Sequence, residues 1–203
     1  MSSLDDSAAI FSYHRGMLSA HGADSSLALG WLDTYSQIVR FEALAGIADL
    51  NRHSILDAGC GYGDLLPFLN QRFTGISYTG IEQIPELLDE AVRRNVNHPS
   101  GQFIAGNFAV MALPQADYVF ASGSLNYRSA DAEFIYKIIE KLYKACRFGL
   151  AFNLLCRITD VGLLVAYNPA DIIDYCKSLC EDAELVNGYA DEDFSVYMRR
   201  QAF

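Results

Sequence analysis

Ile55-Leu56-Asp57-Ala58-Gly59-Cys60-Gly61-Tyr62-Gly63-Asp64 joins a short apolar run to three alternate glycines. The apolar run predicts a buried strand, and the glycines follow at its carboxyl end, just before a segment with a helical pattern. Glycine has no Cβ, so such a loop turns sharply and lets its backbone approach a ligand closely. Open α/β sheets bind ligands at the carboxyl ends of their strands. Residues 55–64 therefore predict a ligand-binding loop in an α/β sheet.

The residues around the glycines indicate the charge of that ligand. Dinucleotide-binding loops read G-x-G-x-x-G and place pyrophosphate on the following helix, whereas this loop reads G-x-G-x-G and ends on Asp64. Asp57 supplies a second carboxylate at the same strand end. Carboxylates repel pyrophosphate and attract an ammonium group. A cationic, amino-acid-like ligand therefore fits this loop better than a dinucleotide does.

Glu82 ends the next predicted strand, in the segment Tyr78-Thr79-Gly80-Ile81-Glu82-Gln83. A carboxylate about 20 residues beyond such a glycine loop commonly accepts hydrogen bonds from ribose hydroxyls. An acidic residue at a strand end can also stabilise the start of the following helix, and Glu82 alone does not distinguish the two roles. Together with the glycines, Glu82 predicts a ribose-binding site.

Short apolar runs alternate with amphipathic segments through most of the chain. The expected strands are 54–58, 77–81, 102–105, 117–121 and 148–155, and the expected helices are 64–71, 85–96, 131–146 and 169–181. This βαβ alternation predicts a doubly wound, mostly parallel sheet with helices on both faces. Two strand-like runs, 183–189 and 194–198, predict a closing antiparallel hairpin. Two helices, 4–21 and 25–50, are expected before the sheet.

Length and charge limit the class of protein. The 203 residues suffice for one domain, so 1–203 is predicted to be a single α/β domain with a helical lid at 1–50 and its core at 51–203. A net charge of −10 disfavours nucleic acid as a partner, because affinity for phosphate backbones comes from Lys and Arg. No run approaches the ~20 apolar residues of a membrane span, and no signal-peptide pattern is present, so a cytoplasmic location is expected. Five cysteines occur without zinc spacing, and no metal site is expected.

The glycine loop and the downstream acid together resemble a known family. The runs Asp57–Gly63 and Gly80–Glu82 are similar to motif I and the following acidic residue of class I S-adenosylmethionine-dependent methyltransferases. The resemblance implies a Rossmann-like sheet of seven strands, S-adenosylmethionine as cofactor and S-adenosylhomocysteine as product. It assigns cofactor binding to Asp57, Gly59, Cys60, Gly61, Gly63, Asp64, Glu82 and Gln83.

Three later positions extend the resemblance. Asn107 and Phe108 stand where the family contacts adenine, and Ser122 follows the fourth predicted strand, beside the expected methyl group. The family usually has Asp in place of Asn107, but an amide oxygen can also accept from the adenine amine. The alternative for Asn107 is a simple turn residue, and for Phe108 a residue of the core.

Arg40 extends the resemblance to the helical segment before the sheet. It resembles an arginine that reaches the cofactor's carboxylate in several small-molecule methyltransferases, and guanidinium pairs well with carboxylate. The alternative is a surface residue whose stem covers the core.

No residue is identified as a catalytic base. The run 122–127 is not the Asn/Asp-Pro-Pro-Tyr sequence of methyltransferases that act on the amino groups of nucleobases or glutamine. His14, on the expected lid, is a weak candidate because imidazole titrates in a useful range. Tyr13 and Tyr127 could orient an acceptor's hydroxyl or carboxylate. A structural role is the alternative for each.

These features predict methyl transfer, by in-line displacement, to a small metabolite or natural product. The expected core leaves little chain for a separate recognition domain. The alternative is a non-catalytic protein that binds S-adenosylmethionine or S-adenosylhomocysteine, or a partner subunit. Such proteins usually lose the glycines or the ribose acid, and this chain keeps both. A protein methyltransferase would need an exposed groove, and the acceptor atom and oligomeric state stay open.

Overall fold

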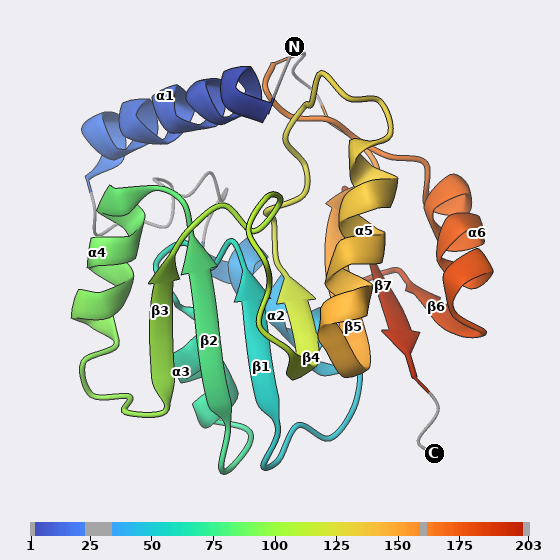
Figure 1. Cartoon of the computed structure of the whole chain (residues 1–203), viewed down its shortest axis with the longest axis horizontal. Helices are drawn as coiled ribbons and strands as arrows, with labels where there is room; N and C mark the ends of the chain where they lie inside the picture. The colour runs from blue at the N-terminus through green and yellow to red at the C-terminus, as the bar shows by residue number, and fades with distance from the viewer. Residues whose placement is uncertain (1–2, 23–33, 159–161, 201–203) are drawn as a thin grey trace.

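The computed structural model describes residues 3–22, 34–158 and 162–200. In this part of the chain seven strands form one sheet in the order β3-β2-β1-β4-β5-β7-β6, with helices on both faces (Figure 1). The strands are β1 (Ser54–Ala58), β2 (Ser77–Glu82), β3 (Gly101–Ala105), β4 (Ala116–Ala121), β5 (Cys146–Leu155), β6 (Asp182–Val186) and β7 (Asp193–Arg199). The helices are α1 (Ser3–His21), α2 (Thr34–Ala45), α3 (Leu65–Asn70), α4 (Pro85–Arg94), α5 (Phe134–Ala145) and α6 (Pro169–Leu179). The predicted fold class is confirmed.

Alternate residues of the central strands face opposite sides of the sheet, and both sides are apolar. In β1, Ile55 belongs to the core cluster that contains Phe41 of α2 and Leu66 of α3. Its neighbour Leu56 belongs to the cluster on the other face, which contains Ile139 of α5. Two apolar faces on one strand require a layer of helices on each side, and this explains the doubly wound arrangement.

The carboxyl ends of the parallel strands meet along one edge of the sheet. β1 pairs in parallel with β2 and with β4, and β2 pairs in parallel with β3. Above this edge lies α1 (Figure 1), whose residues Ile10, Phe11 and Leu18 pack against a small cluster that contains Tyr62 and Ile84. The sequence segments that follow β1, β2, β3 and β4 are thereby gathered under one helix.

The predicted antiparallel hairpin at the end of the chain is confirmed for β6 and β7. β7 is also antiparallel to β5, so it enters the sheet between β5 and β6. The first strand of the hairpin ends at Val186, earlier than the predicted residue 189. Gly188, with a φ angle of 87°, starts the turn there.

Several predicted helix ends are wrong by a few residues. The predicted helix 25–50 is observed only as α2, which ends at Ala45, and its first part, 25–33, lies outside the described residues. α5 begins at Phe134 and not at residue 131, because the Asp131 side chain accepts a hydrogen bond from the Glu133 amide and forms a turn. No helix in the described ranges is long and apolar enough to cross a membrane.

Candidate active site

The loop between β1 and α3, called the glycine loop below (residues 59–63), has left-handed backbone at all three glycines. The φ angles are 83° at Gly59, 54° at Gly61 and 70° at Gly63, values that strain any residue with a Cβ. Space excludes a side chain as well, because a Cβ on Gly59 would lie 2.5 Å from the Cβ of Ser124. The glycines therefore let the loop lie directly against the segment that follows β4.

Glu82, at the end of β2, is a buried carboxylate whose two oxygens both accept from backbone amides. Oε2 accepts from Gly61 at 3.0 Å, and Oε1 accepts from Gln83 at 2.8 Å and from Ile84 at 2.9 Å. Burial raises the pKa of Glu82, and these three amide donors oppose that rise. A carboxylate has about four lone-pair sites, so Glu82 can shape the turn toward α4 and still accept a bond from a ligand.

Asp57, on β1, is the second buried carboxylate of the site. Its Oδ2 accepts from the Tyr78 hydroxyl at 2.6 Å, while its Oδ1 has no hydrogen-bond partner within the described part of the chain. Burial raises the pKa of Asp57 to about 7, the Tyr78 bond opposes this rise, and the nearby charge of Glu82 adds to it. An ionised Asp57 thus presents an unsatisfied anionic oxygen to any cation that enters the site.

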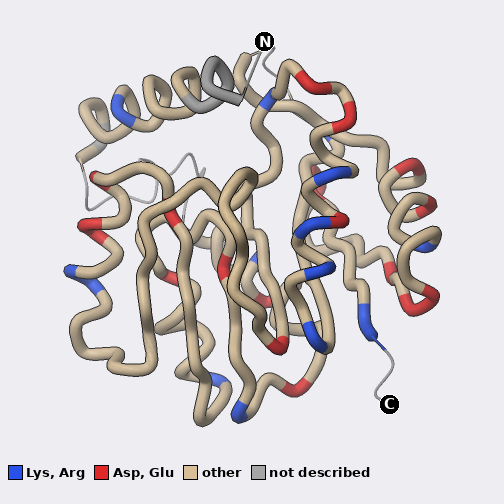
Figure 2. Tube along the Cα trace, viewed as in Figure 1, with Lys and Arg blue, Asp and Glu red and all other residues tan. Residues whose placement is uncertain are grey.

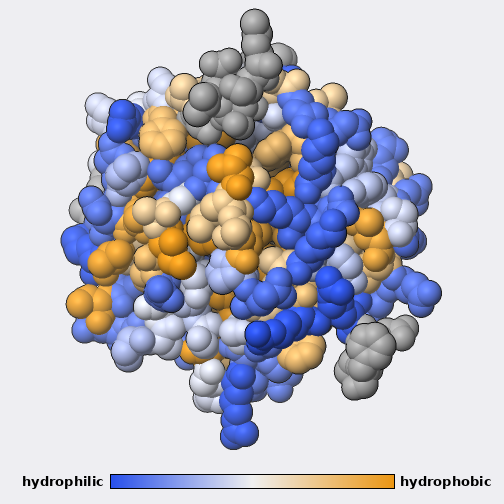
Figure 3. Space-filling view, viewed as in Figure 1, coloured by the Kyte–Doolittle hydropathy of each residue, from blue (hydrophilic) through white to orange (hydrophobic). Residues whose placement is uncertain are grey.

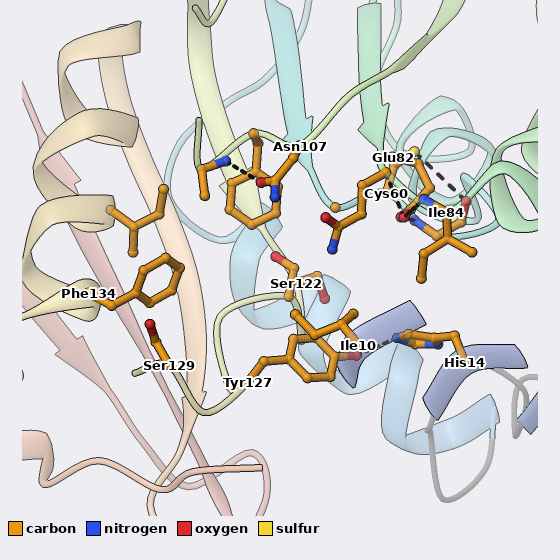
Figure 4. A pocket seen from close by; sticks show the side chains of 18 of the residues that line it. Ile10, His14, Cys60, Glu82, Ile84, Asn107, Ser122, Tyr127, Ser129 and Phe134 are labelled. Carbon is orange, nitrogen blue, oxygen red and sulfur yellow. Dashed lines mark hydrogen bonds between the residues drawn. The ribbon is translucent and has the colours of Figure 1, made fainter. Parts of the chain in front are cut away.

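The glycine loop, the end of β2 and the segment after β4 enclose a cavity of about 510 Å³ (Figure 4). Ile10 and His14 of α1 also line it. The predicted cofactor residues that line it are Asp57, Gly59, Cys60, Gly61, Glu82, Gln83, Asn107, Phe108 and Ser122. Gln83 Oε1 and Ser122 Oγ, like Asp57 Oδ1, are buried without a hydrogen-bond partner among the residues described. The cavity therefore offers several polar atoms to a ligand.

Arg40 lies apart from the lining residues that the structure describes. It is buried, forms an ion pair with Asp193 at the start of β7, and donates from Nη1 to the carbonyl oxygen of Ser36 at 2.6 Å. The alternative of a surface residue is therefore wrong. Its contact with the cofactor's carboxylate stays a prediction.

Asp64 and Gly63 also lie outside the described lining. Asp64 accepts from Gln37 Nε2 at 3.2 Å and from Arg94 Nη1 at 3.3 Å. Gln37, in turn, lines the cavity. Asp64 thus holds a wall residue in place, whereas Asp57 and Glu82 line the cavity themselves. Direct binding of a ligand by Asp64 stays a prediction.

Asn107 and Phe108 both line the cavity just after β3. The side-chain oxygen of Asn107 accepts from the amide of Ala109 at 2.8 Å, which closes a turn. A carbonyl oxygen has two lone pairs, so this turn bond does not by itself exclude a bond from a ligand donor. The two interpretations of Asn107, turn residue and adenine contact, are compatible, and the adenine contact stays a prediction.

His14 and Tyr127 are in contact with each other on one wall of the cavity (Figure 4). His14 of α1 is buried, and its Nε2 lies 2.7 Å from the Tyr127 hydroxyl, which belongs to the segment after β4. Burial raises the pKa of the Tyr127 hydroxyl. Tyr13 contacts the His14 ring edge-on, with 5.2 Å between ring centroids, and is not a described lining residue. The candidate pair for proton transfer is therefore His14 with Tyr127.

Sequence reasoning missed the wall that α5 contributes. The lining residues on α5 are Phe134, Lys137, Ile138 and Lys141, and none of them was predicted. Their spacing places them on one stripe of a helix, so a signal was present. A helical stripe alone does not show which neighbour it faces, and this information comes only from the packing of α5 beside the segment after β3.

Two buried asparagines hold the segment after β4 in place. Asn153 of β5 accepts from the Gly123 amide at 2.8 Å, and Asn126 accepts from the Leu155 amide at 2.9 Å. These bonds tie both ends of the segment 123–126 to β5. Ser122 and Tyr127, which flank this segment, are thereby fixed against the cavity.

Two sequence comparisons find the same protein class. A family model for the methyltransferase domain matches residues 55–149, which include the glycine loop and Glu82. A Mycobacterium tuberculosis protein with the provisional name of methyltransferase is 33% identical over 157 residues. The match covers 72% of this chain and 93% of that protein.

Solved structures share the fold at low sequence identity. The magnesium protoporphyrin IX methyltransferase of Synechocystis PCC 6803 with bound S-adenosylmethionine has a TM-score of 0.70 at 16% identity, covering 99% of this chain and 100% of that one. DhpI, in a complex with S-adenosylmethionine and HEP, has a TM-score of 0.72 at 15% identity, covering 98% and 100%. A possible exported protein from Bordetella parapertussis has a TM-score of 0.67 at 15% identity, covering 80% of this chain and 66% of that protein.

Proposed function

Since the chain belongs to the S-adenosylmethionine-dependent methyltransferase family, we propose that it methylates a small molecule held in the cavity beneath α1. One observation carries the proposal: three left-handed glycines lie beside two buried carboxylates, and this arrangement opens into a cavity with further unsatisfied polar atoms. A cavity that α1 covers favours a small acceptor over a protein chain, which would need an open groove.

The residues present fit the cofactor of this family, S-adenosylmethionine. The free oxygen of Asp57 suits a cationic group, and no described residue occupies it. Glu82 retains lone pairs for the ribose hydroxyls, and Asn107 with Phe108 forms the wall assigned to adenine. Gly59 and Gly61 bring the backbone to the cavity without a side chain in between.

Bound S-adenosylmethionine supplies a methyl group on a positively charged sulfur. The chain's own task is then to position the acceptor in line and to exclude water. Ser122, held by the asparagine-anchored segment after β4, contributes a hydroxyl that lacks a partner among the described residues. Ile10 and His14 of α1 close the cavity above it.

His14 and Tyr127 provide a path for the acceptor's proton. The Tyr127 hydroxyl stays neutral because burial raises its pKa, so it can donate to His14 Nε2 while it accepts from an acceptor hydroxyl or amine. The proton then comes to rest on the imidazole of His14. This role does not require ionised tyrosine at any stage.

Calorimetric titration with S-adenosylhomocysteine, with NAD as a control, tests the cofactor assignment. Micromolar affinity for the former and none for the latter is expected. Binding of NAD, or of neither compound, contradicts the proposal.

Transfer itself is tested with methyl-labelled S-adenosylmethionine and a library of small acceptors. For an acceptor that the wild type methylates, His14→Ala should lower kcat at least tenfold and leave affinity for S-adenosylhomocysteine unchanged. His98→Ala is the matched control, because the His98 ring contacts Asn70 away from the described lining. Tight cofactor binding without any transfer would favour the non-catalytic alternative.

A further inference from the structure

The two ends of the cavity carry opposite charge. The glycine-loop end (Asp57, Gly59–Gly61, Glu82 and Gln83) contains two carboxylates, and no Lys or Arg is among its described lining residues. The α5 end (Arg128–Asp131, Phe134, Lys137, Ile138 and Lys141) contains three cationic side chains and a single carboxylate. Figure 4 shows Glu82 and Cys60 on one side of Ser122, and Phe134 and Ser129 on the other.

The single carboxylate of the α5 end is already neutralised. Asp131 accepts from Lys137 Nζ at 2.6 Å. Lys144, one turn beyond Lys141, is likewise paired with Glu140 at 2.6 Å. Figure 2 shows the resulting series of basic positions along α5. A positive charge in excess therefore remains on the cavity side of this helix.

Lys141 carries part of that excess charge. Its Nζ donates to the carbonyl oxygen of Ala109 at 2.8 Å, and no ion pair of Lys141 occurs within the described ranges. Lys141 is half-buried, and this burial lowers the pKa of its ammonium group. An ammonium has three donors, so two remain for a ligand in the cavity.

Arg128 carries the rest of the excess positive charge at the α5 end. Its Nε and Nη2 lie 3.4 Å from the carbonyl oxygens of Gly162 and Leu164, distances at which hydrogen bonds are weak. A planar guanidinium presents five N–H donors and binds carboxylate or phosphate oxygens in pairs. Arg128 is exposed and can therefore turn toward an anion at the cavity mouth.

Between these cations the wall is apolar. Phe134 and Ile138 face the cavity from α5, and the Tyr127 ring faces it from the opposite segment (Figure 4). On the outer surface, hydrophobic side chains border the hydrophilic band that follows α5 (Figure 3). A ligand with an apolar body and an anionic group at its edge matches this arrangement of side chains.

We propose that the α5 end binds the acceptor, and that this acceptor is an apolar, ring-like small molecule bearing a carboxylate or phosphate held by Lys141 and Arg128. The inference rests on the proposed function, which assigns the cofactor to the glycine-loop end and to the wall formed by Asn107 and Phe108. A net charge of −10 repels anions from the protein as a whole, so an anionic acceptor needs a local cationic patch of this kind.

Three small probes, benzoate, phenyl phosphate and benzamide, test the proposal on protein saturated with S-adenosylhomocysteine. Binding is followed by protein-detected NMR in phosphate-free buffer. Benzoate or phenyl phosphate should bind at least fivefold more tightly than benzamide, and the stronger of the two identifies the anionic group. Lys141→Gln should remove this preference and leave affinity for S-adenosylhomocysteine unchanged. Lys144→Gln, a matched exposed lysine outside the described lining, should retain the preference.

The proposal is overturned if benzamide binds as tightly as the two anions, or if none of the three probes shows saturable binding. An equal loss in Lys141→Gln and Lys144→Gln also overturns it, because the effect would then be one of overall charge. If S-adenosylhomocysteine itself fails to bind, the proposed function fails. The anion preference, measured in the same protein without S-adenosylhomocysteine, still decides whether the α5 end is an anion site.

Discussion

At the glycine-loop end of the cavity the charged groups are carboxylates on short side chains, whereas at the α5 end they are cations on long ones. Glu82 is held by three backbone amides and Asp57 by a buried tyrosine hydroxyl. Lys141 and Arg128 are held only by carbonyl oxygens of neighbouring segments. The first end is therefore rigid before any ligand arrives, and the second can adapt its side chains to the ligand.

This difference suits the two kinds of ligand that the proposed function requires. A cofactor shared by a whole family is bound best by a preorganised site, because no side-chain entropy is lost on binding. Acceptors differ from one member to the next, and specificity then resides in side chains that can change without disturbing the backbone. The following changes test whether the two ends behave in these separate ways.

The largest effect is expected from Glu82→Ala. Loss of charged hydrogen bonds costs roughly 1.5–3 kcal/mol, so affinity for S-adenosylhomocysteine should fall about 10- to 100-fold in calorimetry. Glu82→Gln, which keeps the shape of the side chain, serves if the alanine variant does not fold. Benzoate binding at the α5 end, measured without S-adenosylhomocysteine, should stay as in the wild type. Unchanged affinity in a folded variant contradicts the ribose assignment.

Gly59→Ala tests how rigid the glycine loop is. The φ angle of 83° and the 2.5 Å approach to the Ser124 Cβ leave no room for a methyl group. We expect the free energy of unfolding in urea to fall by about 1–3 kcal/mol. Gly16→Ala on α1, where nothing lies within 4 Å of the new Cβ, is the control and should not lower stability. Equal stability of the two variants would show that the loop adapts.

Asp57→Asn separates affinity from stability at one residue. The folded pKa of about 7 lies above the ordinary aspartate pKa of 3.8, so folding favours the protonated acid, and Asp57 lowers the stability of the ligand-free protein as pH rises from about 4 to 7. Affinity for the ammonium of S-adenosylhomocysteine should change oppositely, rising about five- to tenfold between pH 6 and 8 as Asp57 ionises.

In Asp57→Asn the ligand-free protein should therefore melt at a higher temperature than the wild type at pH 8. Its affinity for S-adenosylhomocysteine should be lower and should vary less with pH. Calorimetry and thermal melts at pH 6 and 8 measure both. A wild-type affinity that is constant between these values excludes Asp57 as the group that binds the cation.

The smallest effect is expected from Tyr127→Phe, because Tyr127 belongs to neither the glycine-loop end nor the α5 end. It removes the hydrogen bond between α1 and the segment after β4. One such bond contributes about 1 kcal/mol, so amide hydrogen exchange in α1 should quicken about fivefold, with affinity for S-adenosylhomocysteine nearly unchanged. Arg15→Gln, which breaks the exposed ion pair with Glu86, should quicken amide hydrogen exchange in α1 less than Tyr127→Phe does. The opposite ranking would show that α1 is held mainly from its outer face.

Residues close together in the sequence were sufficient to predict the sheet and the glycine loop, and the family resemblance that these residues carry predicted S-adenosylmethionine. Gly59, Gly61 and Gly63 are required by local backbone angles, and strand periodicity follows from burial on alternating faces. These constraints act within a few residues, so the chain itself displays them. Element ends were less accurate, as at Ala45 and Phe134, because single turns compete with the last helical hydrogen bonds.

Only the tertiary structure decided which distant side chains meet. Arg40 pairs with Asp193 and His14 meets Tyr127, contacts whose partners lie more than a hundred positions apart in the chain. The same holds for Lys141, which reaches the cavity only because α5 packs beside the segment after β3. A pattern of residue types predicts that a helix has a polar stripe, but the partner of that stripe depends on how the sheet orders its strands. The glycine-loop end could therefore be predicted from the sequence, and the α5 end could not.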